Sequence, residues 1–163
     1  MNKDKLNMLF EYLDGDLFYK KSTALRIKVG KKVGWINGSG YLQAKIDGKS
    51  YLVHRIIFLM HHGYLPKYID HIDTNPLNNR VENLRPATVL QNNQNVNIRK
   101  DNTSGIKGID WKKNTNKWRA RIKIAGVTKN LGEYNDIEYA KFILEAVRNK
   151  YHGNFANNGK DKT

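Results

Sequence analysis

The sequence predicts an α+β protein with a small antiparallel sheet in its first part and a three-stranded antiparallel sheet packed on one helix in its last part. Short alternating runs of apolar and polar residues, separated by glycine-containing turns, predict the strands. Two longer apolar patterns predict helices. The 163 residues suffice for two small domains, because domains range from about 50 to 200 residues.

Four short strands are expected in the first part, at residues 16–20, 33–36, 41–46 and 50–54. Asp47 and Gly48 form a two-residue hairpin signal between the last two strands. The apolar segment 54–62 then predicts a helix, which Gly63 would end. Together these elements predict a small antiparallel sheet followed by one short helix.

Three further strands are expected at residues 108–111, 117–124 and 127–131, followed by a helix over 136–151 with Asp136 as its N-cap. The middle strand alternates throughout, so its apolar and cationic residues lie on opposite faces. The apolar face of the helix would consist of Ile137, Ala140, Leu144, Val147 and Tyr151. The outer face of the strand would carry Arg119, Arg121 and Lys123.

The segment between these parts, residues 68–97, is dense in Asn, Asp and turn-forming residues. It can bury little apolar surface, so its order requires side-chain hydrogen bonds or a metal ion. A long segment of this kind in a small domain is usually functional or disordered. Residues 98–104 resemble a polar hinge.

Positive charge favours a polyanionic partner, since the net charge is +14 and the pI is near 9.9. Residues 1–65 carry 11 basic and 5 acidic side chains, 66–100 carry 5 and 3, and 101–163 carry 13 and 7. The nearly balanced middle is therefore flanked by two segments suited to gripping phosphates. Charge alone also permits RNA, a ribosome or a membrane surface.

Several classes of site are excluded by composition. The chain has no cysteine, so it has no disulfide, thiolate zinc site or cysteine nucleophile, and a metal would be held by oxygen and imidazole. It has no apolar run of the roughly 20 residues needed to span a bilayer, and no signal peptide is expected in its first residues, MNKDKLNMLF. We expect a soluble cytoplasmic protein without a membrane partner.

The stretch from Ile69 to Arg85, IDHIDTNPLNNRVENLR, is followed by Gln91 and Asn92 and preceded by Val53-His54-Arg55. This pattern resembles the HNH endonuclease family, whose fold is the ββα-metal fold. The resemblance implies a nuclease domain over residues 1–97, with its ββα-metal core at about 50–97.

The resemblance also implies a role for each motif residue. Asp70 and Asn92 would be the metal ligands, and His71 the general base. Asn83 would accept a hydrogen bond from the other ring nitrogen of His71 and so fix its tautomer. Many family members have histidine where this chain has Asn92, and the Asp and Asn pair favours Mg²⁺, with Mn²⁺ as an alternative, over zinc.

Structural interpretations compete with these roles. Asp70 and His71 could form a loop turn while the asparagines cap helices; we assign Asp73 and Asn79 to turn architecture. Arg55 could contact a phosphate or stabilise the transition state, or it could pack at the start of the helix beside the sheet. The same two interpretations remain open for His54. His61 and His62 are interpreted as surface or helix-end residues rather than metal ligands, because adjacent residues of a helix point to different faces.

Residues 104–155 resemble the ethylene-response-factor (Apetala) class of DNA-binding domain, which we assign to 105–156, after a hinge at 98–104 and before a tail at 157–163. The resemblance implies that the sheet enters a DNA groove. The candidate contacts are Arg119, Arg121, Lys123, Lys112, Lys113, Lys117 and Trp111. A solvated strand face is the alternative for the cations, and a core position is the alternative for Trp111.

These observations favour a metal-dependent DNA endonuclease of the phage or mobile-element homing type, acting on double-stranded DNA in a bacterial or phage-infected cytoplasm. A catalytically silent DNA-binding regulator is the alternative, and an RNA-binding protein ranks third because the chain lacks an aromatic RNP pattern. The active species could be a monomer or a homodimer. One metal centre most simply makes a nick, and a double-strand break requires a dimer or two events.

Overall fold

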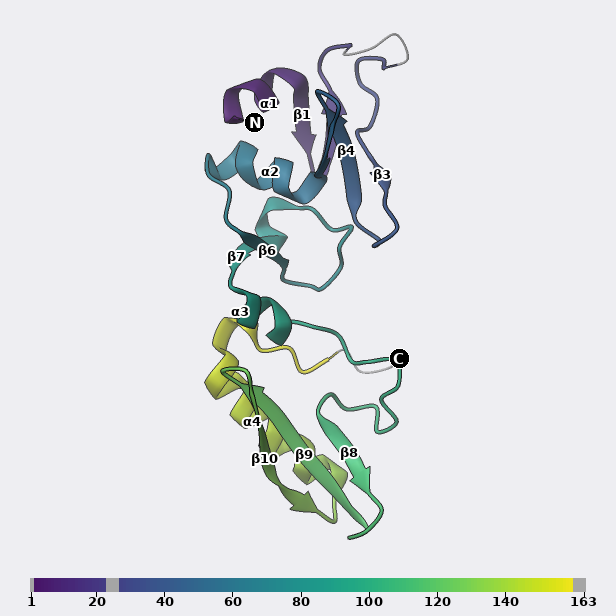
Figure 1. Ribbon diagram of the computed structural model, residues 1–163, viewed down its shortest axis with the longest axis vertical. Helices are drawn as coiled ribbons and strands as arrows, with labels where there is room; N and C mark the ends of the chain where they lie inside the picture. Colours follow the sequence, from purple (N-terminus) through teal and green to yellow (C-terminus); the bar gives the residue numbers. More distant parts are fainter. Residues whose placement is uncertain (1, 23–26, 160–163) are drawn as a thin grey trace. The chain divides into compact units, whose positions relative to one another are not determined.

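A computed structural model describes residues 2–22 and 27–159, and the chain divides into two compact units, residues 1–87 and 88–163 (Figure 1). Both contain helices and small antiparallel sheets, which confirms the α+β fold class. Within the described ranges, no helix has the length and apolar character required to cross a membrane.

The first unit begins with a helix and a hairpin, continues with a three-stranded sheet and a buried helix, and ends with a second hairpin (Figure 1). Its elements are α1 (Lys3–Leu9), β1 (Phe10–Leu13), β2 (Asp16–Tyr19), β3 (Trp35–Ile36), β4 (Leu42–Ile46), β5 (Lys49–Leu52), α2 (Val53–His62), β6 (Tyr68–His71), the 3-10 turn η1 (Val81–Asn83) and β7 (Leu84–Ala87). The expected strands are present with bounds shifted by one or two residues.

Helix α2 forms the centre of the first core. Ile56, Ile57 and Phe58 are at most 1% exposed, and they pack with Ala44 and Ile46 of β4. Each fully buried side chain of this size contributes about 1.5–3 kcal/mol. Gly63 ends the helix at φ 76°, where its amide donates to the Leu59 carbonyl, so the predicted glycine stop is confirmed.

The predicted hairpin turn at Asp47 and Gly48 is also confirmed. Both residues have positive φ, 48° and 78°, as a type I′ turn requires, and Ile46 pairs with Lys49 across it. The turn fixes the register of β4 against β5 and therefore which side chains of β4 face the core.

Helix α1 was not predicted, because seven residues are too few to show a clear helical period. The Asn2 side chain accepts a hydrogen bond from the Lys5 amide and caps the helix. Leu6 and Phe10 are buried in the first core. Part of residues 1–50 therefore completes the core beneath α2.

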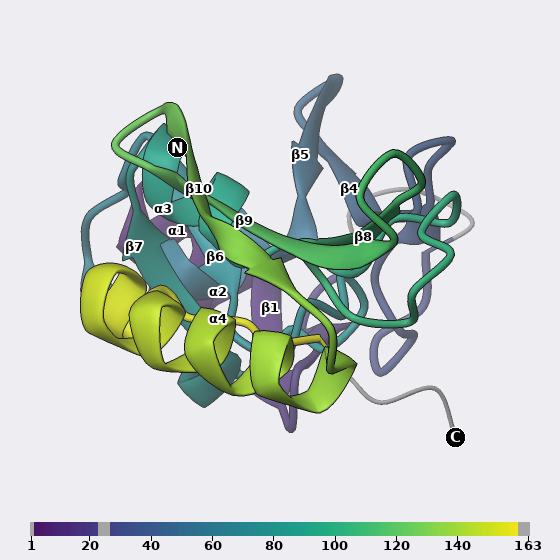
Figure 2. The ribbon, with the colours of Figure 1, turned by 90° about the horizontal axis from the view of Figure 1, so that it is seen from below.

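The second unit consists of a short helix, a three-stranded antiparallel sheet of order β10-β9-β8, and a long helix that lies along one face of that sheet (Figure 2). Its elements are α3 (Val89–Gln94), β8 (Ile109–Lys112), β9 (Lys117–Ile124), β10 (Val127–Tyr134), α4 (Ile137–His152) and the 3-10 turn η2 (Gly153–Phe155). The three-stranded sheet and its covering helix are as the sequence predicts.

The buried face of α4 differs from the prediction at its last turn. Ala140 and Leu144 are fully buried against Ile109 and Ile122 of the sheet. Asp136 caps the helix by accepting from the Tyr139 amide at 2.6 Å, as predicted. Tyr151, expected on the apolar face, is 54% exposed.

Arg148 takes the buried position of that last turn instead and is 3% exposed. Its guanidinium donates to the Lys107 carbonyl at 2.7 Å and to the Asn158 amide oxygen at 2.6 Å. The stem of an arginine covers apolar surface while its head requires acceptors, which a loop and the chain after α4 supply here. Helical periodicity of apolar residues does not predict an arginine at a core position.

Lys107 joins three segments of the second unit. Its ammonium donates to the carbonyls of Gln94, Val96 and Asn157 at 2.9, 2.6 and 3.0 Å. Burial, with the charge of Arg148 nearby, lowers the pKa of Lys107 to about 8, so the group stays largely protonated at neutral pH. The residues after α3 thus pack on the second unit, although the sequence suggested a domain boundary at residue 97.

The expected hinge at residues 98–104 contains ordered turns. Asn102 donates to the Ile106 carbonyl at 3.1 Å, and the Ser104 hydroxyl donates to the Ile109 carbonyl at 2.7 Å. Arg99 pairs with Asp101. Residues 157–159 of the expected tail are described, and residues 160–163 lie outside the described residues.

Replacing Lys107 with methionine, which keeps the length of the stem, is expected to destabilise the second unit by about 1–3 kcal/mol, because carbonyls lose their donor. Thermal unfolding of the full chain measures this. The matched control is Lys113→Met, at an exposed position in the turn after β8, with an expected change near zero. Equal shifts for the two variants would contradict the assignment.

Candidate active site

The two residues at the centre of the motif lie next to each other on β6. Asp70 pairs with Arg85 and His71 pairs with Leu84 across the antiparallel β6–β7 hairpin. Asp70 is 4% exposed and His71 is 6% exposed. Both are buried polar residues, so each must be held by polar partners.

An ion pair to Arg85 orients the Asp70 carboxylate. The guanidinium Nε lies 2.7 Å from Asp70 Oδ2, and Nη2 lies 2.6 Å from the same oxygen. Removing one member of a buried pair leaves the other charge uncompensated, so the two are expected to act as one structural unit. The motif alone does not predict this role of Arg85. Direct cross-strand pairing is the signal that would have found it, once β6 and β7 are recognised as a hairpin.

Asn79 holds the His71 imidazole. The ring Nε2 lies 3.0 Å from Asn79 Oδ1, and Asn79 is only 2% exposed. An amide oxygen can only accept, so in this arrangement Nε2 carries the hydrogen and donates it. The other ring nitrogen, Nδ1, then has the lone pair with which a base takes a proton.

The prediction that the Asn83 side chain accepts a hydrogen bond from His71 is wrong. The Asn83 side chain accepts from the Asp73 amide at 3.0 Å and donates to Asp73 Oδ1 at 2.9 Å and to the Asn78 carbonyl at 2.8 Å. Asn83 therefore closes the loop between β6 and β7, and Asn79, which we assigned to turn architecture, holds the histidine. Spacing alone cannot tell which of several nearby asparagines faces the ring.

Asp73 has the architectural role expected of it. Burial raises its pKa, but hydrogen bonds from the Asn78 side chain, the Asn75 amide and the Asn83 side chain outweigh burial and lower the pKa below its usual value. The charged carboxylate thus accepts from several parts of the loop at once. This network orders a segment that has few apolar residues to bury.

Two aromatic rings surround the other sides of His71. The His54 ring centroid lies 4.9 Å from that of His71, with the planes 76° apart, and the Tyr41 centroid lies 6.1 Å from His71 and 5.6 Å from His54. Burial, followed by the nearby charges of His71 and Arg55, lowers the pKa of His54 to about 3. His54 is therefore neutral throughout the physiological range.

Arg55 connects α2 to the segment that leads into β6. Its Nη1 donates to the Lys67 carbonyl at 3.2 Å and its Nη2 to the Pro66 carbonyl at 3.1 Å. These two hydrogen bonds agree with a structural role for Arg55 beside the sheet. A contact between Arg55 and a DNA phosphate stays a prediction. His61 and His62 lie at the exposed end of α2 and contact the rings of Tyr12 and Phe58, as helix-end residues do.

Asn92 lies on α3 in the second unit, and its pairing with Asp70 stays a prediction. Thr88 and Gln91 form a capping box that starts this helix, and Asn92 is exposed on it. In the described parts of the chain, no group of three or more His, Asp or Glu side chains could hold a metal. One carboxylate and one amide oxygen nevertheless suit Mg²⁺, which keeps several waters when bound.

On the charged face of the second sheet, acidic side chains neutralise part of the positive charge that the alternation of β9 predicts. Arg119 and Arg121 both donate to Asp110, at 2.7 Å each from Nη2, and the Lys112 ammonium donates to Glu133. Burial raises the pKa of Asp110, but the hydrogen bonds from the two arginines outweigh it and lower that pKa. The two guanidinium groups are therefore held in place on this face.

Trp111 does not share that face, and its contact with DNA stays a prediction. It pairs directly with Trp118 across β8 and β9, and their ring centroids lie 4.9 Å apart. Trp118 packs on the core beneath α4, and direct cross-strand partners lie on the same face. Trp111 is 41% exposed and lies at the edge of that apolar face.

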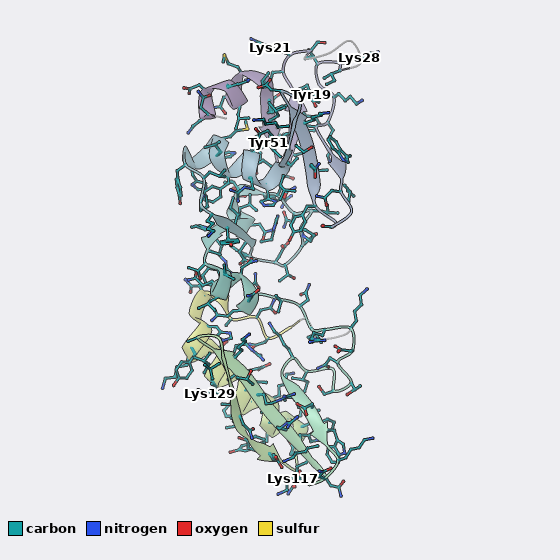
Figure 3. The ribbon with its side chains drawn as sticks, viewed as in Figure 1. Tyr19, Lys21, Lys28, Tyr51, Lys117 and Lys129 are labelled. Carbon is teal, nitrogen blue, oxygen red and sulfur yellow. The ribbon has the colours of Figure 1, made fainter. Side chains whose placement is uncertain are left out.

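The remaining candidate cations are distributed over the sheet and its turn. Lys123 is exposed on β9, Lys113 lies in the turn after β8, and Lys117 begins β9. Figure 3 labels Lys117 and Lys129 toward opposite ends of this sheet. Lys129 pairs with Ile122, so it lies on the face opposite to that of Lys123.

Comparison with known proteins identifies relatives of this chain. Residues 51–94 match a family model described as HNH endonuclease. Protein 3.8 of Escherichia phage T7 is 41% identical over 96 residues, which cover 58% of this chain and 78% of that protein. A protein of Acanthamoeba polyphaga mimivirus described as an uncharacterized HNH endonuclease is 35% identical over 131 residues, covering 78% of this chain and 67% of that protein. No solved structure matches the chain.

Replacing Asn83 with alanine is expected to lower the stability of the first unit by about 2–4 kcal/mol, because the loop loses three hydrogen bonds worth roughly 1 kcal/mol each and keeps unpaired partners. Asn75→Ala is the matched control, since Asn75 is exposed and accepts from the Leu77 amide. Its expected loss is about 1 kcal/mol or less. Urea unfolding measures both, and an Asn83 effect no larger than the control would contradict the architectural role.

Proposed function

This chain belongs to the HNH endonuclease family, and we propose that it is a metal-dependent endonuclease that hydrolyses phosphodiester bonds in double-stranded DNA. The observation that carries the proposal is the Asp70 and His71 pair on β6, with the carboxylate held by Arg85 and the imidazole held by Asn79. Both lie inside the segment that matches the family model. A buried and preoriented base is what hydrolysis requires.

In the proposed reaction, His71 is the general base. Its Nδ1 takes a proton from a water molecule while Nε2 stays bonded to Asn79. The water oxygen forms a bond to phosphorus, the bond between phosphorus and the leaving sugar oxygen breaks, and that oxygen takes up a proton from solvent water. Asn79 keeps the ring from turning as its charge changes.

Asp70 and Asn92 are the proposed protein ligands of a divalent cation, Mg²⁺ or alternatively Mn²⁺. When bound, such an ion would neutralise the negative charge that develops on the phosphate and on the leaving oxygen. Arg85 holds the Asp70 carboxylate in one orientation, and the capping box holds the helix of Asn92. Asn83 acts in this proposal through the loop that places Asn79.

The second unit is the proposed DNA-binding module, similar to the ethylene-response-factor class. The cationic face of its sheet would contact the duplex through Arg119, Arg121 and Lys123, with Lys112, Lys113 and Lys117 near phosphates. Asp110 supports this proposal, because it holds both arginines in fixed positions before DNA arrives. A guanidinium held in advance loses less entropy on binding.

The relatives from a bacteriophage and a giant virus favour a homing-type enzyme of a phage or mobile element, acting in the cytoplasm of a bacterium or infected host. One catalytic centre per chain makes a nick, and a homodimer on DNA would cleave both strands.

Cleavage of supercoiled plasmid DNA tests the proposal directly. The native chain with Mg²⁺ is expected to produce nicked or linear DNA, and excess chelator is expected to stop it. His71→Ala is expected to lower the rate by about 10²–10⁴-fold, the usual contribution of a general base. If the native protein binds duplex DNA but never cuts it, a DNA-binding regulator becomes the better interpretation.

Two neighbouring asparagines on α3 provide a matched test of the metal ligand. Asn92→Ala is expected to raise the Mg²⁺ concentration needed for half-maximal cleavage by about tenfold or more, as loss of a metal contact does. Asn93→Ala is the control, because Asn93 is also exposed on the same helix. Equal behaviour of the two variants would remove Asn92 from the site.

Two lysines on opposite faces of the second sheet test the DNA-binding face. Lys123→Ala is expected to weaken duplex DNA binding by about three- to tenfold and to reduce the salt dependence by about one phosphate contact. Lys129→Ala removes the same charge from the other face and is expected to change affinity less. Fluorescence anisotropy over a salt series measures both, and a larger effect at Lys129 would place the interface elsewhere.

A further inference from the structure

The buried imidazole of His54 takes no part in the proposed reaction. It is the second residue of α2 and is 5% exposed. Its Nδ1 is enclosed and has no hydrogen-bond partner anywhere in the described residues. Buried polar groups are nearly always paired, so a nitrogen left in this state requires an explanation.

Packing does not provide that explanation. The neighbouring residues on α2, among them Val53 and Ile57, are fully buried and apolar. Phenylalanine or leucine would fill such a place without the desolvation cost of an unpaired ring nitrogen. An unpaired buried nitrogen is expected to cost stability, and residues kept at such a cost are characteristic of functional sites.

The position of the ring indicates what it could do. His54 lies edge to face against His71, with the ring centroids 4.9 Å apart, and Tyr41 contacts both rings. On another side, Asn79 bonds His71 Nε2. A hydrogen bond at a ring nitrogen limits rotation of the imidazole, and a second ring packed edge to face against it limits its tilt.

We propose that His54 is a positioning residue for His71, which holds the imidazole in the single orientation and tautomer that the bond to Asn79 selects. Asn79 determines which nitrogen carries the hydrogen, and the His54 ring prevents the imidazole from rotating away from it. Tyr41 completes the enclosure. The consequence for cleavage rests on the proposed function, but the effect on the His71 ring does not.

His54→Phe and His54→Ala test this in the full chain. Phenylalanine keeps a ring and removes the unpaired nitrogen, so its melting temperature is expected to rise or stay the same; alanine removes the ring. Long-range ¹H–¹⁵N correlation spectra of the imidazoles report the tautomer directly. The native His71 is expected to be one tautomer with hydrogen on Nε2, and a folded His54→Ala protein is expected to show a mixture.

His62→Phe is the matched control, because His62 lies on the same helix, at its exposed end, and contacts Phe58 rather than His71. It is expected to leave the His71 spectrum unchanged. In a cleaving protein, His54→Ala is expected to lower the maximal rate about tenfold or more at an unchanged Michaelis constant for DNA. Combined with His71→Ala, it is expected to add no further loss, since it acts through that residue.

The spectra separate this inference from the proposed nuclease activity. A native chain that cuts no DNA but shows the tautomer change would overturn the activity and keep the positioning role. If His54→Ala and His54→Phe both fold and both leave His71 as the native single tautomer, the positioning role is overturned whatever the cleavage assay shows. A single tautomer in His54→Phe with a mixture in His54→Ala would support positioning by the shape of the ring.

Discussion

Hydrogen bonding by side-chain amides is the constraint on which the candidate site depends. The loop between β6 and β7 has little apolar surface to bury, so Asn83, Asn78 and Asp73 take the place of a hydrophobic core there. Their bonds determine where Asn79 lies, and Asn79 determines how the His71 imidazole is held. The chemistry of the base thus depends on groups that never contact the substrate in our proposal.

The elements predicted most accurately from the sequence are those whose signal is local. The Asp47-Gly48 turn, the Gly63 helix stop and the alternation of β9 each depend on residues adjacent in the chain, and each is present in the structure. The predictions that were wrong concern long-range partners. Asn79 rather than Asn83 faces His71, because several asparagines at similar spacing are equivalent until the loop is folded.

The same distinction applies to the second unit. Alternation places Arg119 and Arg121 on one face of β9, but it cannot show that Asp110 of β8 lies between them, since strand register is set by contacts outside the strand. Arg148 and Tyr151 are a second case. Periodicity assigns a core position to the tyrosine, and only the carbonyl of Lys107 and the amide of Asn158 make a buried arginine acceptable.

The attachment of Lys107 to the chain after α3 affects how the protein can be divided. A fragment that stops at residue 97 would contain every residue of the nuclease motif. It would lack Lys107, whose ammonium donates to the carbonyls of Gln94 and Val96. It would also lack Asn157, whose side chain donates to Asn95. The helix that bears Asn92 would lose its anchor. Exchange of the DNA-binding module between relatives, by evolution or by engineering, would therefore have to preserve these carbonyl contacts as well as the motif.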